Sequence, residues 1–269
     1  SLLILQMLQV REPMRILIAN DDGVDAKGIQ VLNRFLSNQY ETVLVAPDRN
    51  RSGASNSLTL TRTLQPKQVA EGQYSVDGTP TDCVNLAISE VIDGRFDFVV
   101  SGINHGPNLG DDVIYSGTVA AAMEARHVGC FAIAVSLVGN QHFETAARVV
   151  MDLLQDHAAL THLSQSLPKG SILNVNVPDV EFDQIKGVKV TRLGYRKSAQ
   201  PAISAQHPRG IPSYWIGALS EPHDEQEGTD FHAINQGYVS ITPLHTDMTC
   251  YSAMTSISAW LNLPSDENE

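Results

Sequence analysis

The sequence predicts an α/β fold with a doubly wound, mostly parallel sheet, followed by a β-rich C-terminal extension and a terminal helix. Three observations predict it. From Met14 to about residue 180, short apolar runs alternate with helical patterns, which is typical of the βα units that build a parallel sheet. Beyond that point, strand-like runs alternate with long polar segments, and the chain closes with an amphipathic segment and an acidic tail. We therefore expect a Rossmann-like domain over the first two thirds of the chain.

Five apolar runs are predicted to be the parallel strands, at residues 15–19, 42–46, 96–100, 131–137 and 172–177. After the first run, the apolar residues of 29–36 recur at helical spacing. The clearest helix start precedes the third run, where Thr79 is the expected cap, Pro80 takes the first helical position and Asp82 completes a capping box. The apolar spacing within 143–154 predicts a helix between the last two runs.

The C-terminal third has a different pattern. Strand-like runs at 188–193, 214–219 and 237–242 alternate with long polar segments, among them 198–213 and 221–230, and no helix is expected between them. These segments exceed the usual connection of ~4–6 residues, so we interpret them as an arm, a lid or a surface that another subunit covers. The last predicted element is an amphipathic helix, with one face formed by Met254, Ile257, Trp260 and Leu261.

We divide the chain into three parts on this basis: a leader or extension at 1–13, a Rossmann-like catalytic domain at 14–180, and an oligomerising C-terminal β-rich arm and helix at 181–269. The leader is rich in Leu and Ile but has no basic stretch and no small-residue cleavage site, so a signal peptide is not expected. No uninterrupted apolar stretch approaches the ~18–20 residues that a membrane span requires.

Composition excludes several classes of protein. The formal net charge of −12 and the absence of a basic stripe or a lysine-rich tract argue against nucleic-acid binding and against a membrane surface. The three cysteines are widely spaced and odd in number, which favours buried thiols in a cytoplasmic protein over a disulfide framework or a zinc site. An anionic substrate would have to be attracted by a bound cation, because the overall charge repels it.

Three polar, glycine-rich loops follow predicted strands, at 20–23, 47–55 and 101–112, and the third leads to Tyr115 and the segment 116–118. In an open α/β sheet the ligand binds beyond the carboxyl ends of the strands, where such loops converge and helix N-termini point. The three loops are therefore the candidate site.

The adjacent carboxylates of Asp21 and Asp22 repel each other unless a cation keeps both ionised. The alternative is that one caps the next helix while the other faces solvent. Ser52 and Asn104, from the other two loops, favour the cation because they supply neutral oxygens. A set of oxygen ligands without His or Cys selects a hard ion, Mg²⁺ or Mn²⁺, over zinc.

The third loop has glycines at 102, 106 and 110, a spacing that fits neither the dinucleotide fingerprint nor the Walker motif. Ser116, Gly117 and Thr118 would still place hydroxyls and amides at the positive end of the following helix, and we interpret this segment as a phosphate site. The alternative role for Ser116 or Thr118 is that of an ordinary N-cap, which is compatible with anion binding.

Other polar residues of these loops leave two interpretations open. Arg49 and Arg51 flank Ser52 and either clamp a phosphate or are solvated. His105 is either a surface residue of the loop or a catalytic one. A serine hydrolase is not expected, because no Gly-x-Ser-x-Gly elbow is present.

Five ordered motifs together resemble the SurE family, the survival protein E nucleotidases. They are Ile18-Ala-Asn-Asp-Asp-Gly-Val24, Ala46-Pro-Asp-Arg-Asn-Arg-Ser-Gly53, Gly78-Thr-Pro-Thr-Asp-Cys83, Ser101-Gly-Ile-Asn104 with Gly106 and Asn108, and Tyr115-Ser-Gly-Thr-Val-Ala-Ala121. The resemblance runs from Met14 into the terminal helix and also takes in 172–178 and 237–244. The leader has no counterpart in it, and His105 stands where a small residue is common.

The resemblance implies a cytoplasmic, metal-dependent phosphatase that hydrolyses nucleoside 5′-monophosphates, often also 3′-monophosphates, and in some members short-chain polyphosphate. It implies one divalent cation per subunit, Mg²⁺ or Mn²⁺, held by Asp21, Asp22, Ser52 and Asn104. It further implies catalytic roles for Asp21 and Asn108, and substrate binding by Asn108, Ser116, Gly117 and Thr118. It also implies a homodimer or homotetramer with exchanged C-terminal segments.

In the expected mechanism the cation polarises a phosphoryl oxygen and activates a water that attacks phosphorus in line. Three alternatives stay open: an aspartyl-phosphate enzyme with Asp21 as nucleophile, a metal-dependent nucleoside hydrolase, and a nucleotide sensor without turnover. The first is disfavoured because Gly23 stands where a second carboxylate is usual. Base preference and the choice between 3′ and 5′ substrates do not follow from the sequence.

Overall fold

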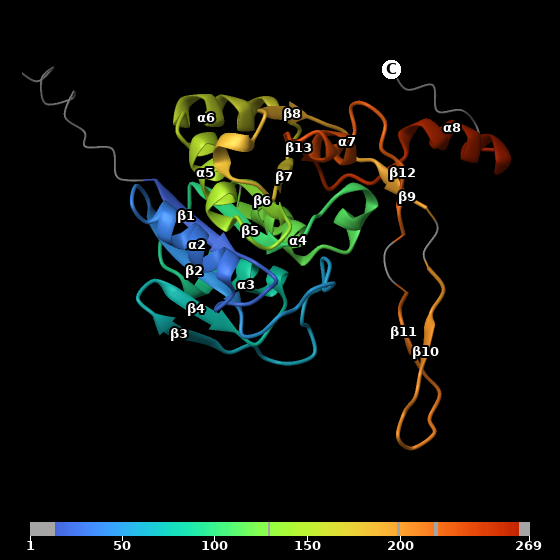
Figure 1. The fold of residues 1–269 in the computed structure, drawn as a ribbon, viewed down its shortest axis with the longest axis horizontal. Helices are drawn as coiled ribbons and strands as arrows, with labels where there is room; N and C mark the ends of the chain where they lie inside the picture. Colours follow the sequence, from blue (N-terminus) through green and yellow to red (C-terminus); the bar gives the residue numbers. More distant parts are fainter. Residues whose placement is uncertain (1–13, 129, 198–199, 218–219, 264–269) are drawn as a thin grey trace, which may run out of the picture.

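A nine-stranded sheet forms the centre of the computed structural model, which describes residues 14–128, 130–197, 200–217 and 220–263 (Figure 1). The strand order is β3-β4-β2-β1-β5-β6-β7-β13-β8. The strands of this sheet are β1 (Arg15–Ala19), β2 (Glu41–Pro47), β3 (Pro66–Ala70), β4 (Gln73–Val76), β5 (Phe98–His105), β6 (Phe131–Val138), β7 (Ile172–Pro178), β8 (Val188–Val190) and β13 (Val239–Leu244). Neighbours from β4 to β7 are parallel, whereas β3 and β13 run antiparallel to β4 and β7.

Helices cover both faces of the sheet. They are α2 (Lys27–Leu36), α3 (Pro80–Leu86), α4 (Gly117–Glu124), α5 (Phe143–Leu154), α6 (His157–Ser166) and α7 (Asp230–Asn235), whereas α8 (Tyr251–Trp260) packs on neither face. α2 packs against α5 on one face, and α3 packs against α4 on the other. Ile16 and Ile18 belong to the first core, whereas Leu17 and Ala19 belong to the second. β1 is therefore buried on both faces, which is why its sequence is apolar without alternation.

The direction in which successive strands are added to the sheet reverses at the boundary between β1 and β5. From β1 it proceeds outward through β2 to β4, and it then returns to the other side of β1 and proceeds through β5 and β6 to β7. The loops after β1 and β5 consequently leave the same edge of the sheet in opposite directions. A crevice at such a switch point is where open α/β sheets bind ligands.

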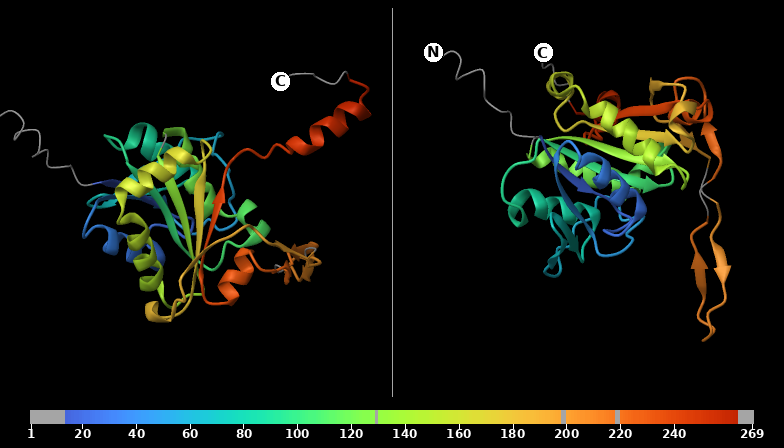
Figure 2. Two further views of the ribbon diagram at one scale, coloured as in Figure 1. Left: turned by 90° about the horizontal axis from the view of Figure 1, so that it is seen from above. Right: turned by 60° about the vertical axis from the view of Figure 1, so that its left-hand side comes forward.

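The C-terminal part includes two elements that project from the body. β10 (Ile203–Ala205) and β11 (Ser213–Trp215) form an antiparallel hairpin below the short pair β9 (Tyr195–Arg196) and β12 (Pro222–Asp224), and this arm extends far from the sheet (Figure 1). α8 also lies away from the body (Figure 2) and has no buried residue. Ile216 is 95% exposed and Trp260 78% exposed, so both elements present apolar side chains to solvent.

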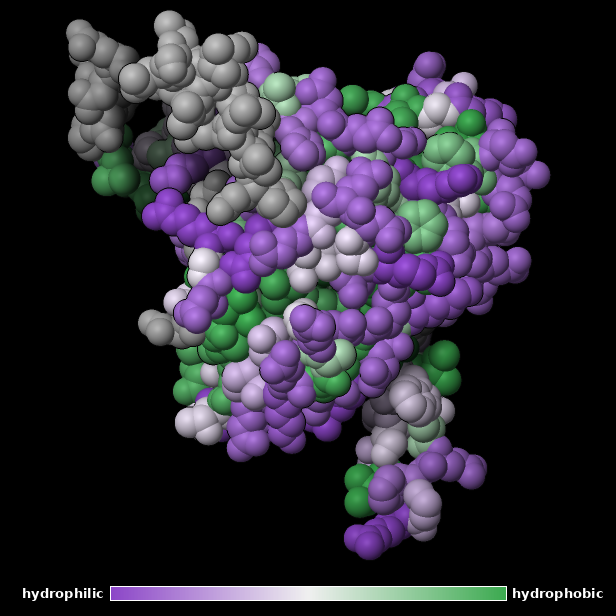
Figure 3. All heavy atoms as spheres, turned by 90° about the vertical axis from the view of Figure 1, so that its left-hand side faces the viewer, coloured by the Kyte–Doolittle hydropathy of each residue, from purple (hydrophilic) through white to green (hydrophobic). Residues whose placement is uncertain are grey.

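The rest of the surface combines polar regions with exposed apolar side chains, such as Leu60 at 86% and Val190 at 79% exposed. One face is mostly hydrophilic, with hydrophobic atoms in separate patches and on the hairpin that projects below it (Figure 3). Within the described part of the chain, no helix combines the length and the apolar character needed to cross a bilayer.

The predicted fold class is confirmed, and so are the five parallel strands and the start of α3. Thr79 accepts a hydrogen bond from the Asp82 N–H while the Asp82 carboxylate accepts one from the Thr79 N–H, which is the predicted capping box. The strand expected at 96–100 instead runs from Phe98 to His105. Its polar end was interpreted as a loop, although it continues the ladder with β6.

Three other elements differ from the sequence prediction. No helix was expected among the strand-like runs between residues 188 and 242, yet α7 begins at the Thr229 cap, whose hydroxyl accepts the His232 N–H. Its six residues are too few for an apolar period to be seen. The β3–β4 hairpin was missed because every residue of β3 is exposed, and α6 was missed because none of its residues is buried. Of the cysteines expected to be buried, Cys83 is, Cys130 is half-buried and Cys250 is exposed.

Asp230 connects the C-terminal part to the loop that follows β5. Its carboxylate is fully buried and accepts the N–H groups of Gly110 at 2.7 Å, Gly194 at 2.9 Å and Phe231 at 2.9 Å. Burial raises the pKa of Asp230, although the three N–H donors act in the opposite direction. The side chain therefore fixes three backbone segments at one point.

Asp230→Ala is expected to lower the free energy of unfolding by about 3 kcal/mol, because three buried N–H groups lose their acceptor. Asp183→Ala, at an exposed carboxylate of the same C-terminal region, is the matched control and should change it by less than about 0.5 kcal/mol. Urea unfolding followed by circular dichroism measures both. Equal effects of the two substitutions would show that the hydrogen bonds to Asp230 do not stabilise the fold.

Candidate functional site

The loop after β1 is held in place by its first residue. Asn20 is fully buried, its Oδ1 accepts the Gly23 N–H at 3.2 Å, and its Nδ2 donates to the Gly23 carbonyl at 2.9 Å. Gly23 has a φ of +106°, and a Cβ there would lie 3.1 Å from the Arg49 carbonyl carbon. A glycine is thus required both for the turn and for the close approach of the loop after β2.

Asp21, the second residue of this loop, contacts the start of α4. Its side chain is only 4% exposed, and its Oδ1 accepts the Thr118 hydroxyl at 2.5 Å. A Cβ on Gly117 would lie 2.7 Å from the Asp21 Cβ, so only glycine allows this approach. The pKa of Asp21 is raised to about 6, chiefly by burial and also by the neighbouring Asp22 charge, against the hydrogen bonds from Thr118 and the Gly117 N–H, which lower it.

Asp22 is less buried and faces the ends of two other strands. Its Oδ2 accepts the His105 N–H at 3.1 Å, and its Oδ1 lies 3.4 Å from the Asn50 Nδ2. Burial raises the pKa of Asp22 as well, while the His105 N–H and ring lower it. The protein therefore holds two adjacent carboxylates whose ionised forms are both disfavoured, and a cation beside them would remove that cost.

The predicted neutral ligands lie on the loops that contact these aspartates. Asn104 is buried next to His105, and its Nδ2 donates to the Gly106 carbonyl at 2.9 Å, which leaves Oδ1 as the atom available to a ligand. Ser52 is exposed, and its N–H donates to the Asn50 Oδ1 at 2.8 Å. The preceding residue, Arg51, donates its N–H to the Asp21 carbonyl at 2.7 Å. The structure thus brings both loops beside the two aspartates.

The donor set suits a hard divalent ion. Two carboxylates, a hydroxyl and a carboxamide provide oxygen only, which is the chemistry that Mg²⁺ and Mn²⁺ prefer. Among the residues with a described position, no three side chains of the His, Cys, Asp and Glu types gather as a metal cluster.

The start of α4 has the geometry of an anion site. Ser116 is the N-cap and accepts the Val119 N–H at 3.1 Å, which leaves its hydroxyl hydrogen free for another acceptor. The Thr118 hydroxyl, in contrast, is already donated to Asp21. The positive end of the helix dipole lies against Asp21 and points to the same place as the carboxylates.

Asn108 is positioned by a buried polar layer that the sequence analysis did not assign. Its N–H donates to the Asn176 Oδ1 at 2.9 Å, and its carbonyl accepts Nδ2 of both Asn174 and Asn176 at 2.9 and 3.0 Å. Its own Nδ2 donates to the Ser136 Oγ at 2.7 Å. Ser136, Asn174 and Asn176 are fully buried. The signal was the pair of asparagines within the otherwise apolar run of β7.

The remaining loop residues are less engaged. Arg49 and Arg51 lie 3.9 and 3.5 Å from the Asp48 carboxylate, and the buried Nε of Arg51 has no hydrogen-bond partner.

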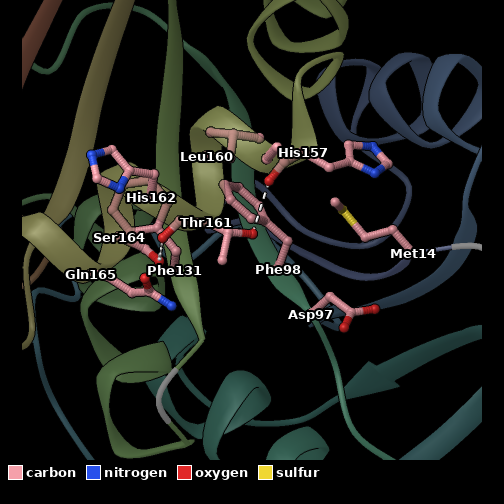
Figure 4. A pocket seen from close by; sticks show the side chains of 11 residues that line it. Met14, Asp97, Phe98, Phe131, His157, Leu160, Thr161, His162, Ser164 and Gln165 are labelled. Atoms are coloured by element: carbon pink, nitrogen blue, oxygen red, sulfur yellow. Dashed lines mark hydrogen bonds between the residues drawn. The ribbon is translucent and has the colours of Figure 1, made fainter.

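A cavity of about 680 Å³ near Phe98, Phe131 and His157 lies at the amino ends of β5 and β6, and none of the predicted site residues lines it (Figure 4). The candidate site is therefore at the opposite edge of the sheet.

The fold and this group of side chains define an α/β protein with a candidate cation and phosphate site at the switch point of its sheet. The family model described as "Survival protein SurE" matches residues 16–200. The chain belongs to the SurE family.

Individual relatives and a solved structure are similar over nearly the whole chain. The "5'-nucleotidase SurE" of Marinomonas sp. (strain MWYL1) is 69% identical over 247 residues, which cover 92% of this chain and 98% of the relative. The protein of the same name from Mannheimia succiniciproducens is 55% identical over 92% of this chain and 99% of its own length. The crystal structure of the SurE protein from Aquifex aeolicus has a TM-score of 0.77 at 42% identity, with 92% of this chain and 99% of that chain covered.

Asp21→Asn is expected to raise the free energy of unfolding at pH 7.5, with chelator present, by about 1–2 kcal/mol. The pKa of Asp21 is about 6 in the folded protein, against 3.8 for the unfolded chain. The free energy of unfolding of the parent therefore falls as the pH rises from about 4 through 6. The gain should be complete above pH 7 and should shrink toward pH 4, where Asp21 is protonated in both states. The gain in stability is limited because the Gly117 N–H loses its carboxylate acceptor in Asp21→Asn.

Denaturant unfolding at a series of pH values between 4 and 8 measures this gain. Asp25→Asn, at an exposed carboxylate in the same loop, is the matched control and should change the free energy of unfolding by less than about 0.5 kcal/mol. An Asp21→Asn gain that is the same at pH 4.5 and pH 7.5 would contradict the raised pKa.

Proposed function

We propose that this protein is a 5′-nucleotidase that hydrolyses nucleoside 5′-monophosphates to nucleoside and phosphate. The proposal extends to 3′-monophosphates and short-chain polyphosphate as further substrates. The observation that carries it is the buried Asp21 beside Asp22, in contact with the N-terminus of α4 through Gly117 and Thr118. The names of the relatives from Marinomonas and Mannheimia support the same activity.

We propose one divalent cation per subunit, Mg²⁺ or Mn²⁺, with Asp21, Asp22, Ser52 and Asn104 as its ligands. The cation supplies Lewis-acid activation of the phosphoryl group and of an attacking water when it is bound. The raised pKa values of Asp21 and Asp22 support this ligand set, because a buried carboxylate pair is costly without a positive charge beside it.

The chain's own groups then bind and orient the phosphate. Ser116, Gly117 and Thr118 present the N-terminus of α4 to it, and Asn108 is the further catalytic and substrate-binding residue. Four hydrogen bonds fix Asn108, two that it donates to Asn176 and Ser136 and two that it accepts from Asn174 and Asn176, so its position costs little reorganisation during the reaction. Asp21 accepts the Thr118 hydroxyl at 2.5 Å, which fixes the carboxylate that orients the attacking water.

We propose further that the chain forms a homodimer or homotetramer in the cytoplasm, in which subunits exchange C-terminal segments, and that 14–180 is the catalytic domain and 181–269 the oligomerising part. The exposed arm and α8 support exchange. A ten-residue helix without a buried side chain is marginal by itself, whereas Met254, Ile257 and Trp260 on α8 are all more than half exposed.

Asp22→Asn is expected to lower kcat/KM for AMP about 100-fold or more, because even groups that only orient metal ligands contribute 10- to 100-fold. Phosphate release from 5′- and 3′-monophosphates, an aryl phosphate and polyphosphate is measured with EDTA and again after Mn²⁺ or Mg²⁺ is added back. EDTA should abolish the activity and the metals should restore it. Full activity of the parent in EDTA, or release of free base without phosphate, would refute the proposal; Asp25→Asn is the control for the fold.

The double substitution Ile257→Asp and Trp260→Asp is expected to reduce the mass in solution to that of a smaller species, because it places charges on the exposed face of α8. Light scattering coupled to size exclusion measures the mass. Val69→Asp, at an exposed position of the edge strand β3, is the control and should leave the mass unchanged. A parent protein that is monomeric at micromolar concentration would contradict subunit exchange.

A further inference from the structure

A second hollow adjoins the candidate site on the side of Asp22. Its volume is about 420 Å³, and its walls include Asp22, Lys27, Asn50, His105, Asn140 and Phe143. These residues come from the loops after β1, β2 and β6, from the end of β5, and from the starts of α2 and α5. The hollow thus opens at the carboxyl edge of the sheet, directly beside a predicted metal ligand.

The position of this hollow determines which part of a phosphate-ester substrate it could hold. A phosphate ester bound by the two aspartates and the start of α4 must place its alcohol part within one ester bond of the phosphate. The hollow includes Asp22 in its wall, whereas the larger cavity at the amino ends of β5 and β6 contains none of these residues. The alcohol part therefore has space on the Asp22 side.

The walls of the hollow suit a flat, aromatic group. The rings of His105 and Phe143 lie with centroids 6.5 Å apart at 72°, an edge-to-face contact. Phe143 is only 4% exposed, and the Lys27 Nζ lies 5.1 Å from the centroid of its ring, so Phe143 forms the floor of the hollow and supports His105 and Lys27 from behind. His105 is exposed, and one face of its ring is available for stacking.

Backbone contacts fix these walls. The His105 N–H is held by the Asp22 carboxylate at 3.1 Å. On the opposite wall the Asn140 N–H donates to the Asp179 Oδ2 at 2.8 Å, and Asp179 also accepts the His142 N–H at the start of α5. Hydrogen bonding holds the pKa of Asp179 below its usual range, so the carboxylate stays ionised. Asn140 is exposed, and its carboxamide can both donate to and accept from a base edge.

We propose that this hollow is the nucleoside subsite, in which the base stacks on His105 over the Phe143 floor and Asn140 contacts its polar edge. The inference rests on the proposed nucleotidase function and adds to it the residues that select a nucleotide over a simpler phosphate ester. His105 and Asn140 are then specificity residues, and the phosphate centre does not depend on their side chains.

The test compares AMP with ribose 5-phosphate, which has the same ester and sugar but no base. His105→Ala is expected to raise KM for AMP about 5- to 10-fold, at the low end of what base–aromatic stacking contributes, with kcat within about twofold. Its kcat/KM for ribose 5-phosphate should stay within about twofold. His105→Phe keeps a flat ring and should restore the AMP value, and Asn140→Ala should raise KM for AMP alone.

His162→Ala, at an exposed histidine of the cavity in Figure 4, is the control and should change neither substrate. An equal loss on both substrates in His105→Ala would place His105 at the phosphate centre and overturn the inference, as would no change on either. A parent that hydrolyses AMP no better than ribose 5-phosphate would also overturn it, although phosphatase activity would stand. A parent that releases phosphate from neither substrate would refute the proposed function itself.

Discussion

The approach of α4 to the end of β1 is the constraint on which the site depends. Gly117 lies so close to Asp21 that a single methyl group would clash with the carboxylate side chain. This contact aligns the positive end of a helix dipole with two carboxylates that burial makes costly to ionise. The proposed cation site and the proposed phosphate site therefore meet at one point of the fold, in a chain whose net charge is −12.

The segment from Asn108 to Ser116 is anchored from outside the site. The buried asparagines of β7 bind its first residue, and Asp230 binds the Gly110 N–H. Asp112 near its end accepts Nε and Nη2 of Arg196, at the base of the arm, at 2.9 and 2.6 Å. The loop, which includes a 3-10 helix at Gly110–Ile114, is thus held at several points by hydrogen bonds from other parts of the chain, as a segment that positions functional groups requires.

Much of the fold could be predicted because it depends on local apolar patterns. The five parallel strands are largely buried and mostly apolar, and the cap at Thr79 has a sequence signature. The β3–β4 hairpin, α6 and α7 have no such signal, since they are exposed or very short. At the site, the three loops were found from their glycines and carboxylates. The roles of Asn174 and Asn176 depend on Ser136 in the neighbouring strand, and the proposed role of His105 depends on the start of α5. Both are contacts between segments that lie far apart in the chain, so the sequence alone does not show them.

The hydrogen bond between Asp21 and Thr118 joins residues 97 positions apart. During synthesis from the N-terminus at about 5–20 residues per second, the two aspartates therefore emerge about 5–20 s before the hydroxyl that completes their surroundings. The nascent chain carries an open, solvated pair of carboxylates for this interval. Until α4 has been synthesised, the two carboxylates lack the Thr118 hydroxyl and the Gly117 N–H that contact Asp21 in the folded domain.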